Sequence, residues 1–92
     1  MTAPAAAAVV MYSTAWCPYC ARARNLLARK GVAFTDIDIE SGSTLRAEMI
    51  EKSGGRRSVP QIFIGSRHVG GCDDLHALDA AGELDALLNA ST

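Results

Sequence analysis

The sequence has no apolar run close to the roughly 20 residues that a membrane-spanning helix requires. It also has no basic cluster of the size that nucleic-acid binding requires, because its nine Lys and Arg residues are offset by ten Asp and Glu residues. The Ala-rich start contains no basic segment of the kind that opens a signal peptide. We therefore expect a cytoplasmic protein that binds neither membranes nor nucleic acid.

A chain of 92 residues is too short to divide into two hydrophobic cores. We expect a disordered leader over residues 1–8 and one domain over residues 9–90. Nothing in the sequence demands more than a monomer.

Cysteine is scarce, with three residues, which is too few for a framework of structural disulfides. Cys17 and Cys20 form a C-x-x-C motif, whereas Cys72 stands alone. There is no second C-x-x-C and no H-x₃₋₅-H, so a zinc site would have to recruit Cys72, His68 and His76. We interpret the motif as a redox pair rather than as half of a zinc site.

Acidic residues are absent from residues 1–30, and all ten lie in residues 31–92. The first segment instead holds four cations: Arg22, Arg24, Arg29 and Lys30. These cations either place positive potential around functional groups on the first helix or form a solvated face that suits the helix C-terminus. The sequence leaves both interpretations open.

Aromatic residues are few, and two of them, Trp16 and Tyr19, flank the thiols. Trp16 either packs against the core, which is the commoner role of tryptophan, or shapes a groove for the substrate beside the nucleophile.

Hydrophobic periodicity and turn residues predict the order β-α-β-α-β-β-α. The predicted strands are Val9–Tyr12, Val32–Ile39, Gln61–Ile64 and Arg67–Val69. The predicted helices are Pro18–Lys30, Thr44–Lys52 and a last one from Asp73 toward Ala90, bent or split near Gly82. The first βαβ unit predicts parallel strands and the closing hairpin predicts an antiparallel pair. The fold class is therefore α/β, with one mixed sheet flanked by helices.

The C-x-x-C motif falls where the first strand gives way to the first helix, with Pro18 at the favoured first helical position. Residues i and i+3 of a helix have Cα atoms about 5 Å apart, which is close enough for a disulfide. Cys17 would lie beside the unpaired N–H groups of the helix N-terminus, which stabilise a thiolate, whereas Cys20 lies one turn further in. We therefore predict that Cys17 is the nucleophile and Cys20 the resolving thiol.

Three separated segments carry a resemblance to the glutaredoxins, in particular to their short bacterial dithiol class. These are Cys17-Pro18-Tyr19-Cys20, Ser58-Val59-Pro60-Gln61-Ile62-Phe63-Ile64 and Gly70-Gly71-Cys72-Asp73-Asp74-Leu75. The resemblance implies the thioredoxin fold, with a four-stranded mixed sheet and with Pro60 in a cis peptide bond facing the cysteine pair.

The resemblance also implies a glutathione site. Its residues would be Tyr19, Arg56, Arg57, Ser58, Val59, Pro60, Gly71, Cys72, Asp73 and Asp74. In that site the Val59 backbone would pair with the glutathione cysteine, and the first N–H groups of the last helix would bind the γ-glutamyl carboxylate. Asp74, with or without Asp73, would bind the ammonium, and Arg56 or Arg57 the glycine carboxylate. The simpler alternatives are that the Asp pair caps the helix and the Arg pair is a solvated loop.

The resemblance implies a glutathione-dependent oxidoreductase that reduces protein–glutathione mixed disulfides and protein disulfides. Glutathione would be a co-substrate, replenished by a separate glutathione reductase, and no tightly bound cofactor is required. Cys72 would be a packing residue rather than a third redox partner. Thr14 departs from the family, since many relatives carry Lys at this position, and its neutral side chain removes a cation near the sulfur.

Two alternatives remain open from the sequence. The first is an iron–sulfur carrier in which Cys17 and glutathione hold the cluster. The second is an oxidoreductase of the same fold that thioredoxin reductase, rather than glutathione, reduces.

Overall fold

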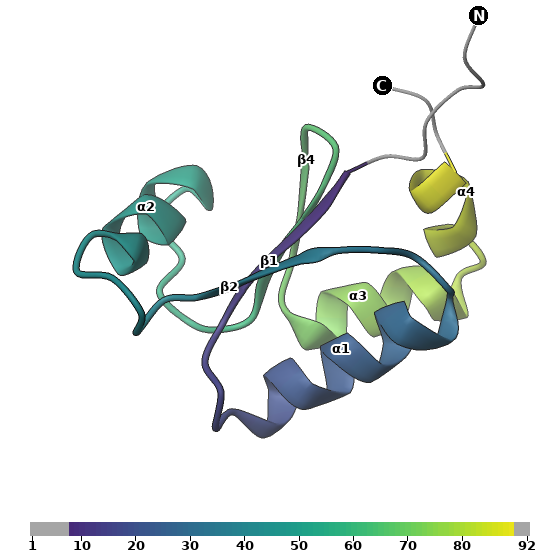
Figure 1. Ribbon diagram of the computed structural model, residues 1–92. Coiled ribbons are helices and arrows are strands. Elements are labelled where there is room, and N and C mark those ends of the chain that lie inside the picture. Colours follow the sequence, from purple (N-terminus) through teal and green to yellow (C-terminus); the bar gives the residue numbers. More distant parts are fainter. Residues whose placement is uncertain (1–7, 90–92) are drawn as a thin grey trace, which may run out of the picture.

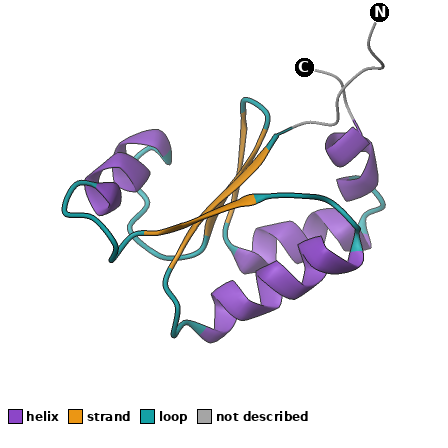
Figure 2. Cartoon of the chain, in the orientation of Figure 1, coloured by secondary structure: helices purple, strands orange, loops and turns teal. Residues whose placement is uncertain are grey.

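A four-stranded mixed sheet organises the fold (Figures 1 and 2). The computed structural model describes residues 8–89 of the chain. Its strands are β1 (Val9–Ser13), β2 (Thr35–Asp38), β3 (Gln61–Ile64) and β4 (Arg67–Gly70), in the spatial order β2-β1-β3-β4. β1 and β2 are parallel, whereas β3 is antiparallel to both β1 and β4. The predicted βαβ unit and the predicted hairpin are both confirmed.

Helices cover both faces of this sheet (Figure 1). The helices are α1 (Pro18–Arg29), α2 (Leu45–Lys52), α3 (Cys72–Ala80) and α4 (Leu84–Asn89). α1 and α3 lie side by side against one face, and α2 lies on the other. Neighbouring side chains of β1 point to opposite faces of the sheet, because side chains alternate along a strand. Met11 belongs to the larger core beneath α1 and α3, and Tyr12 belongs to the smaller core beneath α2.

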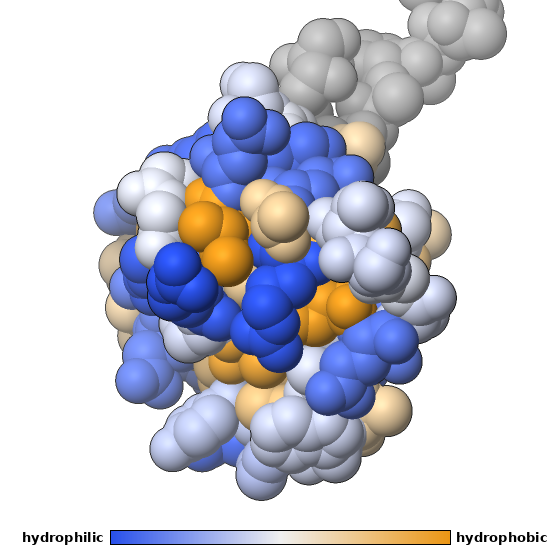
Figure 3. Space-filling view, turned by 90° about the vertical axis from the view of Figure 1, so that its left-hand side faces the viewer, coloured by the Kyte–Doolittle hydropathy of each residue, from blue (hydrophilic) through white to orange (hydrophobic). Residues whose placement is uncertain are grey.

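The smaller core leaves part of its sheet face open. A hollow of about 290 Å³ is lined by Tyr12, Phe63 and Lys52, among others. Figure 3, which views the side of the molecule that carries α2, shows apolar atoms between hydrophilic side chains on this face. The larger core supports α1 and α3, the helices that carry Cys20 and Cys72.

Four predicted strand boundaries were wrong, the first being the end of β1, which extends to Ser13 rather than to Tyr12. β2 spans Thr35–Asp38 rather than residues 32–39, because the parallel register with β1 begins at the Val10–Thr35 pair. Val32 and Phe34 pack against the larger core without strand pairing, which explains their apolar character. The hairpin extends to Gly70, which pairs with Ile62.

The helix boundaries agree more closely with the prediction. α1 ends at Arg29, with Lys30 as its C-cap residue, and α2 begins at Leu45, after Thr44. The last helical region is split as predicted, because Gly82, at φ +75°, separates α3 from α4.

The predicted leader and the predicted end of the domain fall largely outside the described residues. Residues 1–7 and Ala90 are not described, and Ala8 accepts a hydrogen bond from the Gly65 N–H (2.7 Å). Within residues 8–89, the longest helices are too short and too polar to cross a membrane.

Candidate active site

Cys17 lies at the junction between β1 and α1. It is the N-cap residue of α1, with an extended backbone (φ −82°, ψ 122°), and Pro18 is the first helical residue. Cys20 faces the same side of the helix one turn further along. The exposed fraction is 7% for Cys17 and 0% for Cys20, so only Cys17 reaches the surface. Both thiols are free, as a reduced dithiol requires.

The surroundings of Cys17 lower its thiol pKa below the ordinary value. Burial of the sulfur acts to raise the pKa, but the N–H of Cys20, the Cys20 thiol, the N–H of Tyr19 and the charge of Arg24 together outweigh it. These N–H groups belong to the first turn of α1, where the positive end of the helix dipole also favours a negative sulfur. The predicted thiolate stabilisation at this helix N-terminus therefore has a structural basis.

Cys20 has the opposite character. Burial, together with the hydrogen bond and the charge of Cys17, raises its pKa to about 11, although the Thr14 N–H and Arg24 act against the shift. At neutral pH the pair thus holds one accessible sulfur that ionises readily and one buried sulfur that stays protonated.

This difference predicts selective alkylation at neutral pH. One equivalent of iodoacetamide should modify Cys17 much faster than Cys20, because the thiolate is the reacting form. Cys72 should also lag, since it is only 4% exposed and burial raises its pKa. Peptide mapping by mass spectrometry after brief exposure measures the three rates, and preferential labelling of Cys20 would contradict the assignment.

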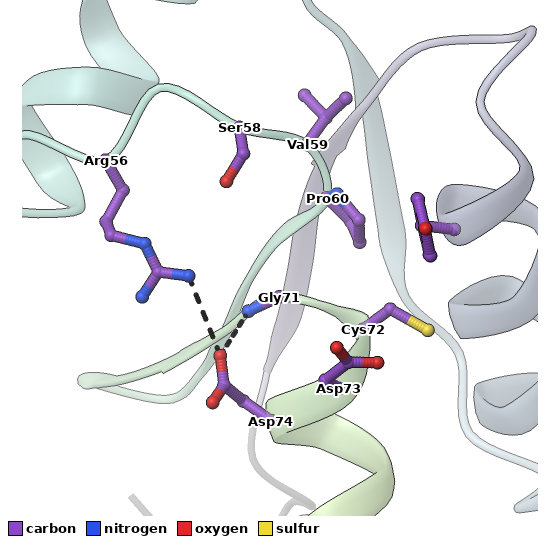
Figure 4. A pocket seen from close by; sticks show the side chains of 9 residues that line it. Arg56, Ser58, Val59, Pro60, Gly71, Cys72, Asp73 and Asp74 are labelled. Atoms are coloured by element: carbon purple, nitrogen blue, oxygen red, sulfur yellow. Dashed lines mark hydrogen bonds and ion pairs between the residues drawn. The ribbon is translucent and has the colours of Figure 1, made fainter.

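A pocket of about 400 Å³ opens beside the dithiol (Figure 4). The residues that line it are Tyr19, Arg56, Ser58, Val59, Pro60, Gly71, Cys72, Asp73 and Asp74. They come from the start of α1, the loop before β3 and the start of α3, which are far apart in the sequence. The volume falls in the range of small-molecule sites. Of the residues that the sequence assigned to glutathione, Arg57 alone does not line this pocket.

The loop before β3 connects this pocket to the nucleophile. The Val59–Pro60 peptide bond is cis, as the family resemblance implied. The Val59 carbonyl lies 4.0 Å from the Cys17 sulfur, within hydrogen-bonding reach of its thiol. A molecule bound along this loop would therefore meet the Cys17 sulfur.

Asp74 organises the far end of the pocket. Its Oδ2 accepts a hydrogen bond from the Gly71 N–H (2.9 Å) and lies 3.7 Å from the Arg56 guanidinium (Figure 4). The helix-capping interpretation of Asp74 is therefore confirmed, and its side chain also faces the pocket. Gly70, at φ +115°, approaches Asp74 so closely that a Cβ there would collide with the carboxylate.

The N-terminus of α3 is open toward the pocket. Its N-cap residue is Gly71, which has no side chain to cap the helix, so the N–H groups of Cys72 and Asp73 have no side-chain cap. Acidic side chains in the first turn, Asp73 and Asp74, suit the positive end of the helix dipole.

Cys72 occupies a packing position. Its side chain belongs to the larger core, and its sulfur lies 3.4 Å from Nδ1 of His76 in the next turn of α3. His68 has a different partner, since its Nε2 lies 2.7 Å from Oε1 of Gln61. Within residues 8–89, no three His, Cys, Asp or Glu side chains gather in an arrangement that could hold a metal ion.

Of the two roles left open for Trp16, packing against the core is wrong. The side chain is 70% exposed, and its Nε1 donates a hydrogen bond to Glu40 (3.0 Å). It therefore forms part of the surface beside Cys17. Tyr19 is 54% exposed, and the Arg22 guanidinium lies 6.0 Å from the centroid of its ring.

The four cations of the first segment have different roles. Lys30 pairs with Asp79 and Asp85 at the far end of α1, and Arg29 is an exposed residue of the last turn. Arg24, by contrast, is one of the charges that act on both Cys17 and Cys20. The roles of these four cations could not be distinguished from the sequence, because spacing does not reveal which of them acts on the sulfurs.

Comparison with known proteins gives consistent matches. The family model described as Glutaredoxin matches residues 9–69. Glutaredoxin of Pseudomonas aeruginosa is 62% identical over 82 residues, covering 89% of this chain and 96% of the relative. Glutaredoxin 3 of Escherichia coli K12 is 55% identical over 80 residues, covering 87% and 95%.

Solved structures agree with these relatives. The solution structure of glutaredoxin from Brucella melitensis superimposes with a TM-score of 0.82 at 56% identity, covering 96% of this chain and 95% of that one. A crystal structure of a buckwheat glutaredoxin–glutathione complex gives a TM-score of 0.82 at 30% identity, covering 89% and 76%. The thioredoxin-type fold implied by the resemblance is confirmed. The chain belongs to the glutaredoxin family and is a glutathione-dependent thiol–disulfide oxidoreductase.

Proposed function

We propose that the protein reduces protein–glutathione mixed disulfides, and also protein disulfides, with Cys17 as nucleophile and Cys20 as resolving thiol. The observation that carries the proposal is the pocket beside Cys17, in which groups suited to glutathione lie next to a sulfur whose pKa is lowered. A related protein of known structure, from buckwheat, forms a complex with glutathione.

The recognition of glutathione follows from its charges. The open N–H groups of Cys72 and Asp73 suit the γ-glutamyl carboxylate, and the Asp74 carboxylate suits the neighbouring ammonium. The Arg56 guanidinium, which comes from the loop before β3 and lies 3.7 Å from the Asp74 carboxylate, suits the glycine carboxylate. The Val59 backbone would pair with the glutathione cysteine and bring its sulfur toward Cys17.

The reaction with a mixed disulfide has two steps. The Cys17 thiolate attacks the glutathione sulfur, the original S–S bond breaks, and the protein substrate leaves as a thiolate that takes up a proton. A second glutathione thiolate then attacks the glutathione sulfur bound to Cys17. This attack releases oxidised glutathione and regenerates the Cys17 thiolate.

A protein disulfide requires Cys20. Attack by Cys17 leaves a mixed disulfide with the substrate, and the charge on Cys17 disappears. That charge and the hydrogen bond to Cys17 are two of the causes that raise the pKa of Cys20, so their loss makes Cys20 easier to ionise. Cys20 then attacks the Cys17 sulfur, the substrate leaves as a thiolate, and two glutathiones later reduce the Cys17–Cys20 disulfide.

Turnover of a glutathionylated peptide, coupled to glutathione reductase, tests the proposal. The paired variants Arg56→Gln and Arg57→Gln provide a matched comparison, because only Arg56 lines the pocket. Arg56→Gln should raise the KM for the glutathionylated peptide about fivefold, the size expected for one partly solvated charge-assisted contact. Arg57→Gln should leave the KM within about twofold of the wild type.

Equal effects of the two Arg variants would show that the pocket is not the glutathione site. An inactive wild type that purifies anaerobically with visible absorbance would instead support the iron–sulfur carrier. Reduction by thioredoxin reductase, without glutathione, would support the second alternative, an oxidoreductase of the same fold that does not depend on glutathione. We further propose that the protein works as a monomer in the cytoplasm, since every residue of the proposed site lies within one chain and glutathione keeps that compartment reducing.

A further inference from the structure

A hydrogen-bonded network lies behind the dithiol, on the side away from the glutathione pocket. Nε of Arg24 contacts Oδ2 of Asp36 at 2.5 Å, and the Ser13 hydroxyl donates to the other oxygen of the same carboxylate. The terminal NH2 of Arg24 donates to Oγ of Ser13 (2.9 Å) and to the Thr14 carbonyl (3.2 Å). The network thus joins α1, the end of β1 and β2, the elements that meet at the Cys17 loop.

Arg24 lies one helical turn beyond Cys20. It follows Cys20 by four residues, so the two side chains lie on the same face of α1. One edge of the guanidinium binds Asp36, and the other binds Ser13 and Thr14, the residues that lead from β1 into the Cys17 loop. The positive charge is therefore held against the residues that precede Cys17, one turn of α1 away from Cys20.

The network is partly withdrawn from water, unlike an ordinary surface ion pair. The Arg24 and Asp36 side chains are 28% and 30% exposed, and Ser13 and Thr14 are completely buried. Reduced solvation makes the interaction of a fixed charge with a nearby sulfur stronger than in bulk water. Three contacts also hold the guanidinium in one orientation, so the charge does not have to be positioned when the thiolate forms.

Thr14 brings no charge to this region, and its hydroxyl has no hydrogen-bond partner within the described part of the chain. The cationic charge behind the dithiol therefore comes from α1 rather than from the loop. Arg24 is the charged side chain that acts on both Cys17 and Cys20, and in each case it favours the ionised sulfur.

We propose that Arg24, held by Asp36, Ser13 and the Thr14 carbonyl, is a positioning residue that stabilises negative charge on the Cys17–Cys20 pair. The inference rests on the proposed role of Cys17 as nucleophile and adds a cation to the N–H groups and the Cys20 thiol that favour its ionised form. Because a stabilised thiolate favours the reduced dithiol, Arg24 also makes the pair a stronger oxidant.

One further thiol, Cys72 on α3, interacts with the charge of Cys17 and remains unchanged in the test. Cys72 senses the charges of Cys17, Arg22 and Asp73, so its titration must be separated from that of Cys17. The ultraviolet absorbance of the thiolate, recorded against pH with and without Cys17→Ser, makes that separation.

The variants Arg24→Gln, Arg24→Lys and Asp36→Asn test the proposal, with Arg29→Gln as the control. Arg29 is an exposed cation of the same helix that lies in its last turn. In Arg24→Gln the Cys17 thiolate fraction below the midpoint should fall about threefold, which corresponds to about half a pKa unit. The dithiol–disulfide equilibrium with glutathione should shift about threefold toward the disulfide. Arg24→Lys should restore most of both values, and Arg29→Gln should change neither.

Asp36→Asn distinguishes an electrostatic role from a structural one. Asn retains an oxygen that accepts from Arg24, but it removes the charge that offsets the guanidinium. The Cys17 midpoint should therefore stay the same or fall in Asp36→Asn, opposite to its rise in Arg24→Gln. A loss of local structure would move both variants in the same direction, and that result would overturn the proposal.

The pH dependence of the first step, the reaction of the reduced protein with a glutathionylated peptide in a single turnover, provides a second readout. Arg24→Gln should be slower than the wild type at low pH, where the thiolate fraction limits the rate. The difference should vanish or reverse at high pH, where Cys17 is ionised in both proteins and a thiolate of higher pKa is the stronger nucleophile. A rate lowered equally at all pH values would overturn the proposal. A wild type without glutathione turnover would refute the proposed function, whereas the thiolate titration would still decide the role of Arg24.

Discussion

Cys17→Ser should abolish turnover of a glutathionylated peptide, with a loss of more than about three orders of magnitude. A serine hydroxyl is not ionised at neutral pH and forms no disulfide, so neither step of the reaction can occur. The assay is the coupled oxidation of NADPH through glutathione reductase. The variant should still fold, because Cys17 is the N-cap residue of α1 and serine is a favoured N-cap residue.

Cys20→Ser is the matched variant for this prediction. It should keep substantial turnover of the glutathionylated peptide, where glutathione completes the reaction, and lose reduction of protein disulfides, where an internal thiol must resolve the intermediate. Retained peptide turnover in Cys17→Ser, or its complete loss in Cys20→Ser, would reverse the two assignments. The burial of Cys20 and its pKa of about 11 argue for the roles as proposed.

Leu27→Ala should lower the free energy of unfolding by about 2–5 kcal/mol. Leu27 lies on α1, is fully buried in the larger core, and packs in the layer that α1 and α3 share above the sheet. Truncation removes buried apolar surface and leaves a cavity that the surrounding helices cannot fill completely. Chemical denaturation of the reduced protein, followed by far-ultraviolet circular dichroism, measures the loss.

Leu87→Ala is the matched control, because Leu87 is a half-buried leucine on α4 that packs against the edge of the same core. Its truncation should cost about 1 kcal/mol, since part of the side chain already faces water. Equal losses for the two variants would mean that α1 is no more tightly packed than α4. In that case the dithiol would lack the rigid support that the structure indicates.

The elements with strong local signals could be predicted from the sequence. Pro18 and Gly31 bracket α1, and Gly65-Ser66 connects the two strands of the hairpin, because proline and glycine constrain the backbone wherever they occur. The ends of β2 could not be predicted. Val32 and Phe34 are apolar because they pack against the core, and an apolar pattern does not distinguish packing from strand pairing.

The site shows the same division. The C-x-x-C spacing and the helix N-terminus indicated a reactive Cys17 and a protected Cys20, because both depend on local geometry. The sequence could not choose between Arg56 and Arg57, since only the course of the loop decides which of two adjacent side chains faces the pocket. It also could not choose between the two roles of Trp16, whose exposure depends on which elements surround it.

By itself, the sequence determined the family and the order of the elements, and it predicted the nucleophile, since the motifs and turns that carry these conclusions each consist of residues near one another in the chain. Only the tertiary structure brought the loop before β3 and the start of α3 together around one pocket beside Cys17. It alone selected Arg24 from four cations, by placing Asp36 of β2 beside α1. Contacts between residues distant in the sequence form only when the chain packs, so spacing along the chain carries no record of them.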